Sequence, residues 1–377
     1  MLPRTRPLIA LTLVVTSLAS CGSPGPAEEP PLSEEALAAV SSNPGAPTKA
    51  LAREIDDLFV GEGLGETRAL IVMKDGKLAA ERYAEGYDTD TRFVSWSMAK
   101  TVTAIMIGQL VGDGLLRLDA PAPVPRWQRS GDPRAEITLR HLLQMRSGLE
   151  HTEAGDPPFE SSEVRMLFLD GRDDMADYAT AQPPEAEPGA KFEYSSNTSV
   201  ILADIAARTL SGGNSAEARR QAVSDYLHAR LLDPLEMSSM VPEFDRAGTL
   251  VGGSLMHASA RDWAKLGELL RRKGSHRGEQ LVPRSWIDAM VQPSPKSPHY
   301  GLQTWLNRPN GLDEHPLFPD SAPHSLFAMI GHMGQYVIVS PEQGLTVVRL
   351  GHSNAQEREA MLKQLAEIIE LYPSPGT

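Results

Sequence analysis

Ser97-Met98-Ala99-Lys100 opens the strongly apolar stretch from Thr101 to Leu116. Residues three apart share a face of a helix, so the Ser97 hydroxyl and the Lys100 amine are expected side by side. A serine hydroxyl becomes a nucleophile when a base takes its proton, and an amine whose pKa is lowered by partial burial can take it near neutral pH. Because roughly one Ser-x-x-Lys is expected here by chance, its meaning depends on the rest of the sequence.

Length and composition limit the fold and function classes. The 377 residues can bury a large core, in one big domain or two interleaved ones. A hydrophobic content of 41% and a charged content of 23% are ordinary for a globular protein. The net charge of -13 argues against electrostatic binding to nucleic acid or to an acidic membrane surface. Neither His-Glu-x-x-His nor a cysteine ligand set occurs, so no metal or cofactor is expected.

The first residues resemble a bacterial lipoprotein signal. Arg4 and Arg6 precede the apolar run Leu8 to Val15, and Leu18-Ala19-Ser20-Cys21 is similar to a lipobox. Cys21 is the only cysteine, so it cannot form an internal disulfide, and a role outside the fold suits it. We expect removal of residues 1–20, lipidation of Cys21 and an exported, membrane-anchored protein on the periplasmic, outer-membrane or cell-surface side. The alternative is an ordinary signal peptide with an incidental cysteine.

Residues 21–47 are predicted to be a Pro-rich tether, because six prolines fall between 22 and 47. A brief helix is expected within it, near Ser33 to Val40. The folded domain is predicted to span 48–372, beginning where apolar residues first recur at helical spacing. Beyond the signal, the sequence contains no stretch that predicts a transmembrane span.

Strand patterns occur at both ends of the domain. Ala69 to Met73 and Lys77 to Tyr83 flank Asp75-Gly76, a strong hairpin signal. Three late strands and an amphipathic helix are predicted at Phe327 to Ile330, Tyr336 to Val339, Leu345 to Leu350 and Asn354 to Leu371. The fold class is therefore α/β (α+β): one sheet built from N- and C-terminal strands (about 48–96 and 255–372), flanked by helices, with an inserted, mostly helical part (about 97–254). We expect a cleft where the two parts meet.

Two further short motifs fall at plausible places for this cleft. Tyr194-Ser195-Ser196 precedes a helix-like stretch, and a tyrosine there could relay a proton to a leaving group. The alternative is a half-buried aromatic residue that hydrogen-bonds a loop. Gly331-His332-Met333-Gly334-Gln335 enters a late strand, where glycines allow a ligand to approach the backbone closely. A simple β-bulge is the alternative there.

The order Ser-x-x-Lys, Tyr-x-Ser and His-x-Gly resembles the serine hydrolases of the penicillin-binding protein and class C β-lactamase superfamily. The resemblance covers about residues 65 to 368. Four further segments are similar to the family: Ile137 to Leu149, which ends in Ser-Gly-Leu, Asp233-Pro234-Leu235-Glu236-Met237, Gly252-Gly253-Ser254, and the helix containing Asp262-Trp263-Ala264-Lys265-Leu266-Gly267. The resemblance implies a β-lactamase/transpeptidase-like fold.

The resemblance also implies roles for single residues. Ser97 would be the acylated nucleophile, Lys100 its base or hydrogen-bond partner, and Tyr194 the second proton carrier. The backbone N–H groups of Ser97 and Gln335 would form the oxyanion hole, since Gln335 follows the glycine of the strand. Ser196, His332 and Gly334 would lie against the substrate. Which of Lys100 and Tyr194 is the acylation base stays open, because two such groups titrate as a coupled pair.

Departures from the family pattern narrow the expected activity. Its β-lactamases and peptidases usually have Lys-Thr-Gly on the last strand, where this chain has His332-Met333-Gly334. An imidazole holds a substrate carboxylate less well than an ammonium group does. Class C enzymes have Tyr-x-Asn, whereas here Ser196 takes the third place and Asn197 follows one residue late. These features resemble the esterase-like branch and the 6-aminohexanoate-dimer hydrolases, as do Trp96 and Tyr300-Gly301-Leu302-Gln303-Thr304-Trp305.

The sequence therefore predicts hydrolysis of a small-molecule ester, amide or peptide-like substrate through an acyl-Ser97 intermediate. β-Lactamase or D-alanyl-D-alanine peptidase activity is the first alternative, and a non-catalytic ligand-binding relative is the second. A nucleophile elbow at Gly351-His352-Ser353-Asn354-Ala355 is disfavoured, because no histidine or aspartate follows Ser353. That segment instead predicts a strand-to-helix turn capped by Ser353 or Asn354. The sequence gives no indication of the oligomeric state.

Overall fold

The computed structural model describes residues 31–213, 215–309 and 317–374. The predicted signal sequence and Cys21 lie outside these ranges, as do residues 22–30 of the Pro-rich segment. Within the described ranges, no helix is both long enough and apolar enough to cross a membrane.

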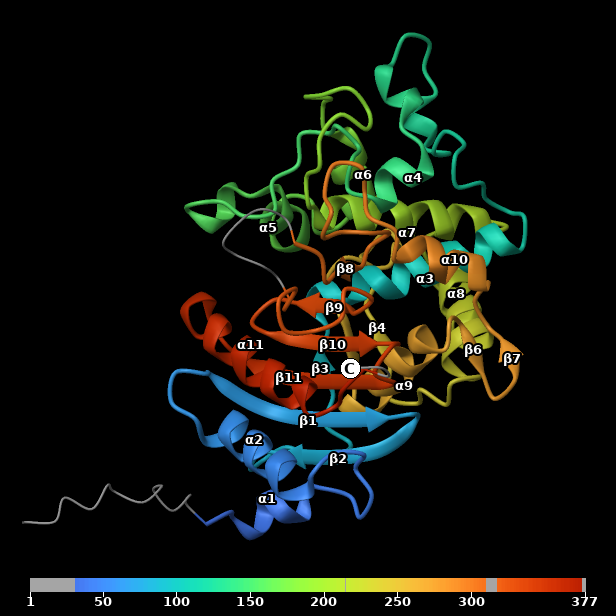
Figure 1. Ribbon diagram of the computed structural model, residues 1–377. Coiled ribbons are helices and arrows are strands. Elements are labelled where there is room, and N and C mark those ends of the chain that lie inside the picture. Colours follow the sequence, from blue (N-terminus) through green and yellow to red (C-terminus); the bar gives the residue numbers. More distant parts are fainter. Residues whose placement is uncertain (1–30, 214, 310–316, 375–377) are drawn as a thin grey trace, which may run out of the picture. The chain divides into compact units, whose positions relative to one another are not determined.

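The strands of the main sheet come from the two ends of the chain, and the middle of the chain is mostly helical (Figure 1). The helices are α1 (Glu34–Ala38), α2 (Thr48–Val60), α3 (Ala99–Gly112), α4 (Leu139–Leu143), α5 (Ser162–Phe168), α6 (Met175–Ala181), α7 (Ser196–Leu210), α8 (Ala216–Leu227), α9 (Ala260–Arg271), α10 (Arg284–Met290) and α11 (Ala355–Glu370). The strands are β1 (Glu66–Lys74), β2 (Lys77–Tyr83), β3 (Phe93–Val94), β4 (Val241–Pro242), β5 (Met256–Ala258), β6 (Ser275–His276), β7 (Glu279–Gln280), β8 (Trp305–Leu306), β9 (Phe327–Gly331), β10 (Gln335–Ser340) and β11 (Leu345–His352).

The main sheet joins the two ends of the chain, as the sequence predicts. Its strand order is β2-β1-β11-β10-β9-β8, and all neighbouring strands are antiparallel. In Figure 1 the blue strands β1 and β2 lie beside the red strand β11. The hairpin between them turns at Asp75 and Gly76, whose φ angles of 51° and 80° suit the tight turn that Asp-Gly favours. The predicted closing helix is α11, and Asn354 caps it by accepting from two backbone N–H groups.

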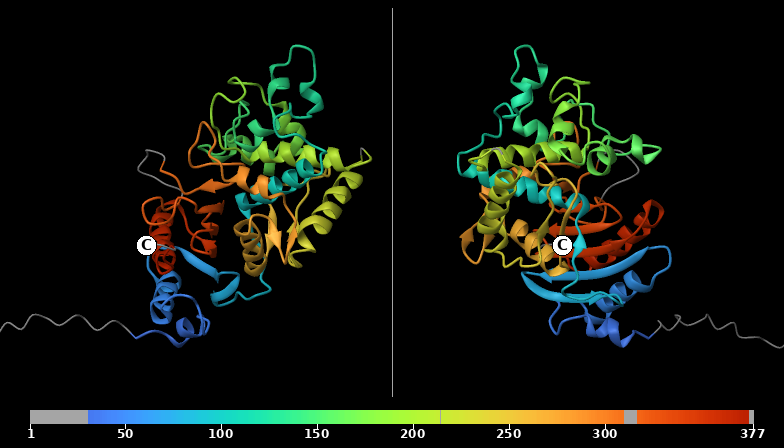
Figure 2. Two further views of the ribbon diagram at one scale, coloured as in Figure 1. Left: turned by 45° about the vertical axis from the view of Figure 1, so that its right-hand side comes forward. Right: turned by 180° about the vertical axis from the view of Figure 1, so that it is seen from behind.

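Both faces of this sheet are covered, and successive residues of a strand pack on opposite sides. Along β10, Val337 and Val339 face the larger core under α9, whereas Tyr336 and Ile338 face a smaller core with α2 and α11. The left view of Figure 2 shows α2 and α11 on one side of the sheet and α9 on the other. The layers are therefore helices, sheet and helices, with the helical middle packed beyond one edge.

Helix α3 is the centre of the helical part. Every residue from Ala99 to Leu110 is buried, Lys100 among them, so the helix is surrounded rather than amphipathic. It ends at Gly112, before the predicted Leu116, and Gly114 then turns the chain with φ 74°. Ser97 lies one turn earlier, in the 3₁₀ turn Trp96–Met98, and not within the α-helix itself.

The start of the folded part differs from the prediction. Glu34–Ala38 forms the expected brief helix, but this helix packs on the domain instead of standing free in a tether. Ala36 is fully buried, the Ser33 hydroxyl donates to Asp56 at 3.1 Å, and Val40 pairs with Ala80 beside β2. Because β2 is the last strand of the sheet, its outer edge is free to take up this segment. The segment from about residue 33 thus belongs with the domain.

Candidate active site

Ser97 lies at a strained turn between β3 and α3. The preceding Trp96 has φ 44°, an unusual backbone conformation for a bulky residue, and it turns the chain sharply into the helix. Buried Ser95 anchors the other side of the turn, because its hydroxyl accepts from Met256 N–H at 3.1 Å and its N–H donates to Met256 O at 2.7 Å. The turn thus holds Ser97 at the N-terminal end of α3, where free N–H groups favour a developing negative charge.

Lys100 lies beside Ser97, as the spacing predicts. Its side chain is only 1% exposed, and Nζ lies 2.9 Å from Ser97 Oγ, 2.7 Å from Ser196 Oγ and 2.9 Å from Gly253 O. An ammonium group has three hydrogens and no lone pair, so these three acceptors fit the charged form of lysine. The protonated amine is therefore the resting state that this arrangement favours.

The pKa of Lys100 shifts in the direction opposite to the one expected from the sequence. Burial alone would lower this pKa, but Tyr194, Glu153 and Glu163 outweigh burial and raise it. Burial also raises the pKa of the Tyr194 phenol, while the Lys100 charge and hydrogen bonding to Ser97 and Lys100 act against that rise. The prediction of a depressed lysine pKa was wrong because it considered burial alone and not the charges of Tyr194, Glu153 and Glu163, which raise this pKa.

Tyr194 is held by an aromatic cluster. Its ring packs on Tyr300 and Trp305 with centroid distances of 5.7 and 5.2 Å, and Lys100 Nζ lies 4.8 Å from the centroid of the Tyr194 ring. Tyr300 and Trp305 begin and end a segment that the sequence already singles out. The buried Gln303 between them accepts from Ser199 Oγ at 2.6 Å, which ties this segment to α7. The Tyr194 phenol is thus held at the pocket by the segment from Tyr300 to Trp305, which is itself tied to α7, and by Lys100 on α3.

Ser196 lies at the start of α7, fully buried, and contacts two carboxyl groups. Its N–H donates to Glu153 Oε2 at 2.6 Å, and its Oγ lies 2.7 Å from Glu153 Oε1 and 2.9 Å from Glu163 Oε1. Glu153 Oε1 is also 3.6 Å from Lys100 Nζ. Asn197 points elsewhere, since its Oδ1 accepts from Ser162 Oγ at 3.4 Å. As the sequence predicts, Ser196 rather than Asn197 therefore takes the third place of the Tyr-x-Ser motif beside Lys100.

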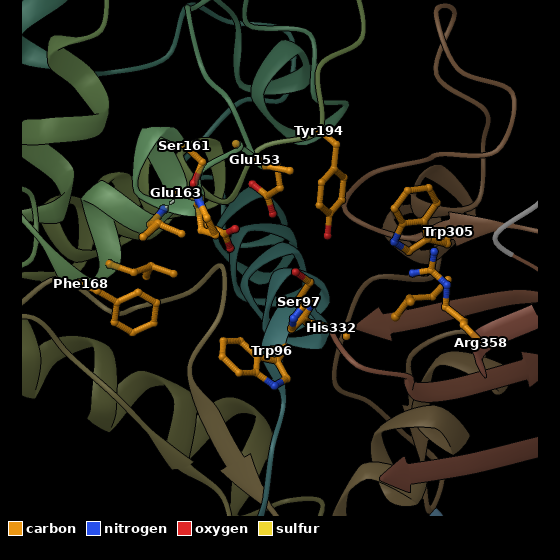
Figure 3. A pocket seen from close by; sticks show the side chains of 17 residues that line it. Trp96, Ser97, Glu153, Ser161, Glu163, Phe168, Tyr194, Trp305, His332 and Arg358 are labelled. Carbon is orange, nitrogen blue, oxygen red and sulfur yellow. Dashed lines mark hydrogen bonds between the residues drawn. The ribbon is translucent and has the colours of Figure 1, made fainter. Parts of the chain in front are cut away.

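A cavity of about 530 Å³ lies beside these groups, between the helical part and the sheet. Figure 3 shows Glu153 and Glu163 on the helical side, Tyr194 above Ser97, and Arg358 on the side of the strands. The lining residues are Trp96, Ser97, Glu153, Ala154, Gly155, Pro158, Ser161, Glu163, Val164, Leu167, Phe168, Tyr194, Trp305, Ile330, Gly331, His332 and Arg358. Among the described residues, no group of three or more His, Cys, Asp or Glu side chains could hold a metal ion.

Strand β9 supplies the wall opposite the carboxyl groups. Gly331 packs against the serine turn so closely that a Cβ atom there would lie 2.3 Å from Ser95 O. The His332 ring packs edge-on against Trp96 with a centroid distance of 5.4 Å. Burial, and then the nearby charge of Arg358, lowers the pKa of His332. His332 is therefore a neutral wall residue at neutral pH, and the cation on this side of the pocket is Arg358.

Three residues predicted to lie at the substrate or the oxyanion, Ser196, Gly334 and Gln335, are not among those that line the pocket. Gln335 begins the next strand, β10, and its side chain holds the turn by donating to Gly351 O at 2.7 Å and to His332 O at 3.1 Å. Gly334 lies in the turn with φ 81°, and its carbonyl accepts from Arg349 Nη1 at 2.8 Å. The turn between the two strands is only three residues long, so Gly334 and Gln335 lie at its far end. The residues of this segment that line the pocket are Ile330 and Gly331, at the end of β9, and His332, which follows the strand. The oxyanion role of the Gln335 backbone N–H stays a prediction.

Sequence reasoning missed the roles of three acceptors and one cation. No sequence motif singles out Glu153 or Glu163, and Gly253 appears only within a matching tripeptide. Arg358 is an exposed residue on α11, and no ion pair links it to another residue in the described ranges. A Glu or Arg in a loop or on an exposed helix face is ordinary, so no spacing rule distinguishes these positions.

The fold and this site define a β-lactamase/transpeptidase-like protein with a Ser–Lys–Tyr cluster between sheet and helices, in which Lys100 is buried and Ser97 and Tyr194 line the pocket. A model of the family described as Beta-lactamase matches residues 62–370, and the chain belongs to that family.

Three similar proteins come from this fold group. The 6-aminohexanoate-dimer hydrolase of Paenarthrobacter ureafaciens is 25% identical over 236 residues, which cover 60% of this chain and 57% of that protein. A Bacillus anthracis structure assigned as a 6-aminohexanoate-dimer hydrolase has a TM-score of 0.64 and 20% identity over 82% of this chain and 81% of its own. The hydrolase EstCE1, described as having promiscuous acyltransferase activity, has a TM-score of 0.63 and 17% identity over 86% and 99%.

Proposed function

We propose that this protein is a serine hydrolase that cleaves a small ester or amide through an acyl-Ser97 intermediate. The observation that carries the proposal is the contact of 2.9 Å between Lys100 Nζ and Ser97 Oγ at a pocket that Tyr194 also lines. A buried lysine with no substrate-facing chemistry would be costly, whereas one bonded to an accessible serine has an evident use. Membership of the Beta-lactamase family supports this reading.

The chemistry requires one proton to leave the Lys100–Tyr194 pair before the reaction. With that proton gone, the pair accepts the Ser97 proton as Oγ forms a bond to the substrate carbonyl carbon. The pair then returns the proton to the departing alcohol or amine as the carbonyl–heteroatom bond breaks. Water repeats the same steps on the acyl-enzyme and releases the acid. The Ser97 N–H and the edge of β9 at Gly331 and His332 are the candidates for stabilising the oxyanion.

The pocket lining favours a largely apolar substrate. Trp96, Val164, Leu167, Phe168 and Ile330 form much of the wall, so an acyl or alcohol group without charge would bury apolar surface there. His332 stands where the family's β-lactamases usually have lysine, which disfavours tight holding of a carboxylate. A simple ester or linear amide is therefore the proposed substrate class, and the similarity to a 6-aminohexanoate-dimer hydrolase supports the amide option.

Intact-protein mass spectrometry after incubation with a fluorophosphonate tests the nucleophile. We expect one adduct on the wild-type protein and none on Ser97→Ala. Ser95→Ala is not a suitable control because Ser95 anchors the turn, so Ser285→Ala, an exposed serine on α10, serves instead and should label normally. An adduct that survives Ser97→Ala would contradict the assignment, as would the absence of labelling in a folded wild-type protein.

A substrate panel then separates the candidate activities. p-Nitrophenyl acetate and butyrate, nitrocefin and a linear amide dimer would be compared at equal enzyme concentration. We expect ester turnover that exceeds nitrocefin turnover and disappears in Ser97→Ala. Preferential nitrocefin hydrolysis would favour the β-lactamase alternative, and specific binding without labelling or turnover would favour a ligand-binding relative.

For the N-terminus we propose lipidation of Cys21 and a membrane anchor, on the strength of the lipobox-like sequence alone. Expression in a bacterium fed a radiolabelled fatty acid should label the wild-type chain and leave Cys21→Ser unlabelled. Equal labelling of the two chains would refute the proposed anchor.

A further inference from the structure

The Ser196 hydroxyl has three close partners, and it cannot form hydrogen bonds with all three if both carboxyl groups are ionised. Its oxygen lies 2.7 Å from Lys100 Nζ, 2.7 Å from Glu153 Oε1 and 2.9 Å from Glu163 Oε1. A hydroxyl donates one hydrogen and accepts through two lone pairs. The ammonium group donates into one lone pair, and the Ser196 hydrogen goes to one carboxylate. The third contact is a hydrogen bond only if the other carboxyl group is protonated and donates to the remaining lone pair.

The contacts identify which carboxyl group carries that proton. Glu153 accepts from the Ser196 N–H at 2.6 Å and from the Ser196 hydroxyl, and it faces Lys100 Nζ at 3.6 Å, so its environment favours the charged form. Glu163, in contrast, forms its side-chain hydrogen bond with the Ser196 hydroxyl. Glu163 also faces Glu153, and two charged carboxylates sharing one hydroxyl would repel each other. The proton therefore belongs on Glu163.

We infer that Glu163 is a positioning residue whose carboxyl proton completes the hydrogen bonds of Ser196, so that Ser196 and Glu153 together hold Lys100 against Ser97. The inference rests on the proposed function, because a fixed lysine matters only if it serves Ser97. Glu163 acts on Ser97 indirectly, through Ser196 and Lys100.

The surroundings of Glu163 agree with a proton held near neutrality. Burial, and then the Glu153 charge, raises the pKa of Glu163 to about 7, although Lys100 acts in the opposite direction. The titratable or charged groups that face this region come from several elements. They are Lys100 on α3, Glu153 in the loop before α5, Tyr194 before α7, His332 after β9 and Arg358 on α11. On α6, Asp177 is turned away and paired with Arg126.

Loss of the Glu163 proton would change the site in two ways. The Ser196 hydroxyl could no longer satisfy both carboxylates, so one of them would move away and loosen the contact to Lys100. A second negative charge near Lys100 would also stabilise its ammonium form and reduce the fraction of the Lys100–Tyr194 pair that can accept the Ser97 proton. Both changes slow acylation as pH rises through the range in which Glu163 titrates.

The experiment measures the rate of fluorophosphonate labelling of Ser97 from about pH 5.5 to about pH 9. Wild-type protein should show a downward bend near pH 7. Glu163→Gln keeps a neutral donor to Ser196, so it should lack the bend and, between about pH 6 and about pH 8.5, gain about fivefold in rate relative to wild type. Glu163→Ala, without the donor, should label about tenfold more slowly throughout. Glu160→Gln, an exposed neighbour, is the matched control and should follow wild type.

An unaltered bend in Glu163→Gln, or a wild-type profile without a bend, would overturn the inference. Infrared difference spectra between about pH 6 and about pH 8.5 provide a readout independent of labelling. The band of a protonated carboxyl group should appear at the lower pH in wild type and be missing in Glu163→Gln; its absence from wild type would place no proton on Glu163. If Ser97 is not labelled at all, the proposed function fails, while the infrared result still decides where the proton lies.

Discussion

The two walls of the pocket are built in different ways. On the helical wall, hydrogen bonds of 2.6 to 2.7 Å connect Lys100, Ser196 and Glu153, and Lys100 is only 1% exposed. On the strand wall, His332 touches Trp96 through an edge-on ring contact, and Arg358 is exposed and forms no ion pair within the described residues. The first wall carries a dense polar network beside the apolar side chains of α5, whereas the second leaves its polar side chains available to a ligand.

This difference suggests a division of roles. A dense buried network fixes atoms before the substrate arrives, which is what proton transfer requires. A sparsely bonded wall costs little to rearrange around different substrates. Changes on the helical wall should therefore lower kcat for every substrate, whereas changes on the strand wall should alter KM for some substrates and not for others.

The largest effect is expected from Lys100→Met, which keeps the apolar stem and removes the amine. Acylation should slow by about 10³- to 10⁴-fold for neutral esters and linear amides alike, because the Ser97 proton loses its acceptor. Stopped-flow or single-turnover kinetics would measure this step. Lys49→Met, an exposed lysine on α2, controls for the substitution and should be unchanged. A loss confined to one substrate class would break the proposed division between the walls.

Ser196→Ala should have the next largest effect. It removes the hydroxyl that joins Lys100 to both carboxyl groups, and the loss of charge-assisted hydrogen bonds of this kind costs about 1.5 to 3 kcal/mol. We expect kcat to fall by about 10- to 100-fold, with KM nearly constant, for every ester tested. A change in KM alone would mean that Ser196 contacts the substrate, as the sequence predicts, rather than the catalytic lysine.

The contrast between the walls also explains what the sequence could predict. Ser97 and Lys100 are three residues apart, so the helix period brings them together, and Tyr194 was found through its place before α7. The main sheet followed from the Asp75-Gly76 turn and the late apolar runs. These predictions rest on local periodicity or on motif order, and the fold places them where they were expected.

Glu153 could not be found in this way, because only tertiary packing brings its loop to the start of α7. The error in the direction of the Lys100 pKa has the same origin: the sequence indicates a buried amine, but not which charges will face it. The sequence also could not show that Gln335 begins β10 and is not among the residues that line the pocket, because a count from the glycine does not reveal where one strand ends and the next begins. Distances across the pocket depend on these non-local contacts.

The smallest effect is expected at the strand wall, from Arg358→Gln. If this exposed cation attracts substrates, KM for an ester that carries a carboxylate should rise about threefold, in line with the modest worth of an exposed ion pair, while KM for a neutral ester stays constant. Raising the salt concentration should reduce the difference between the two proteins, because exposed charges are screened. Lys363→Gln on the same helix α11 is the control. Equal changes in KM for charged and neutral esters would indicate that Arg358 has a structural role and that the strand wall does not recognise the charge of the substrate.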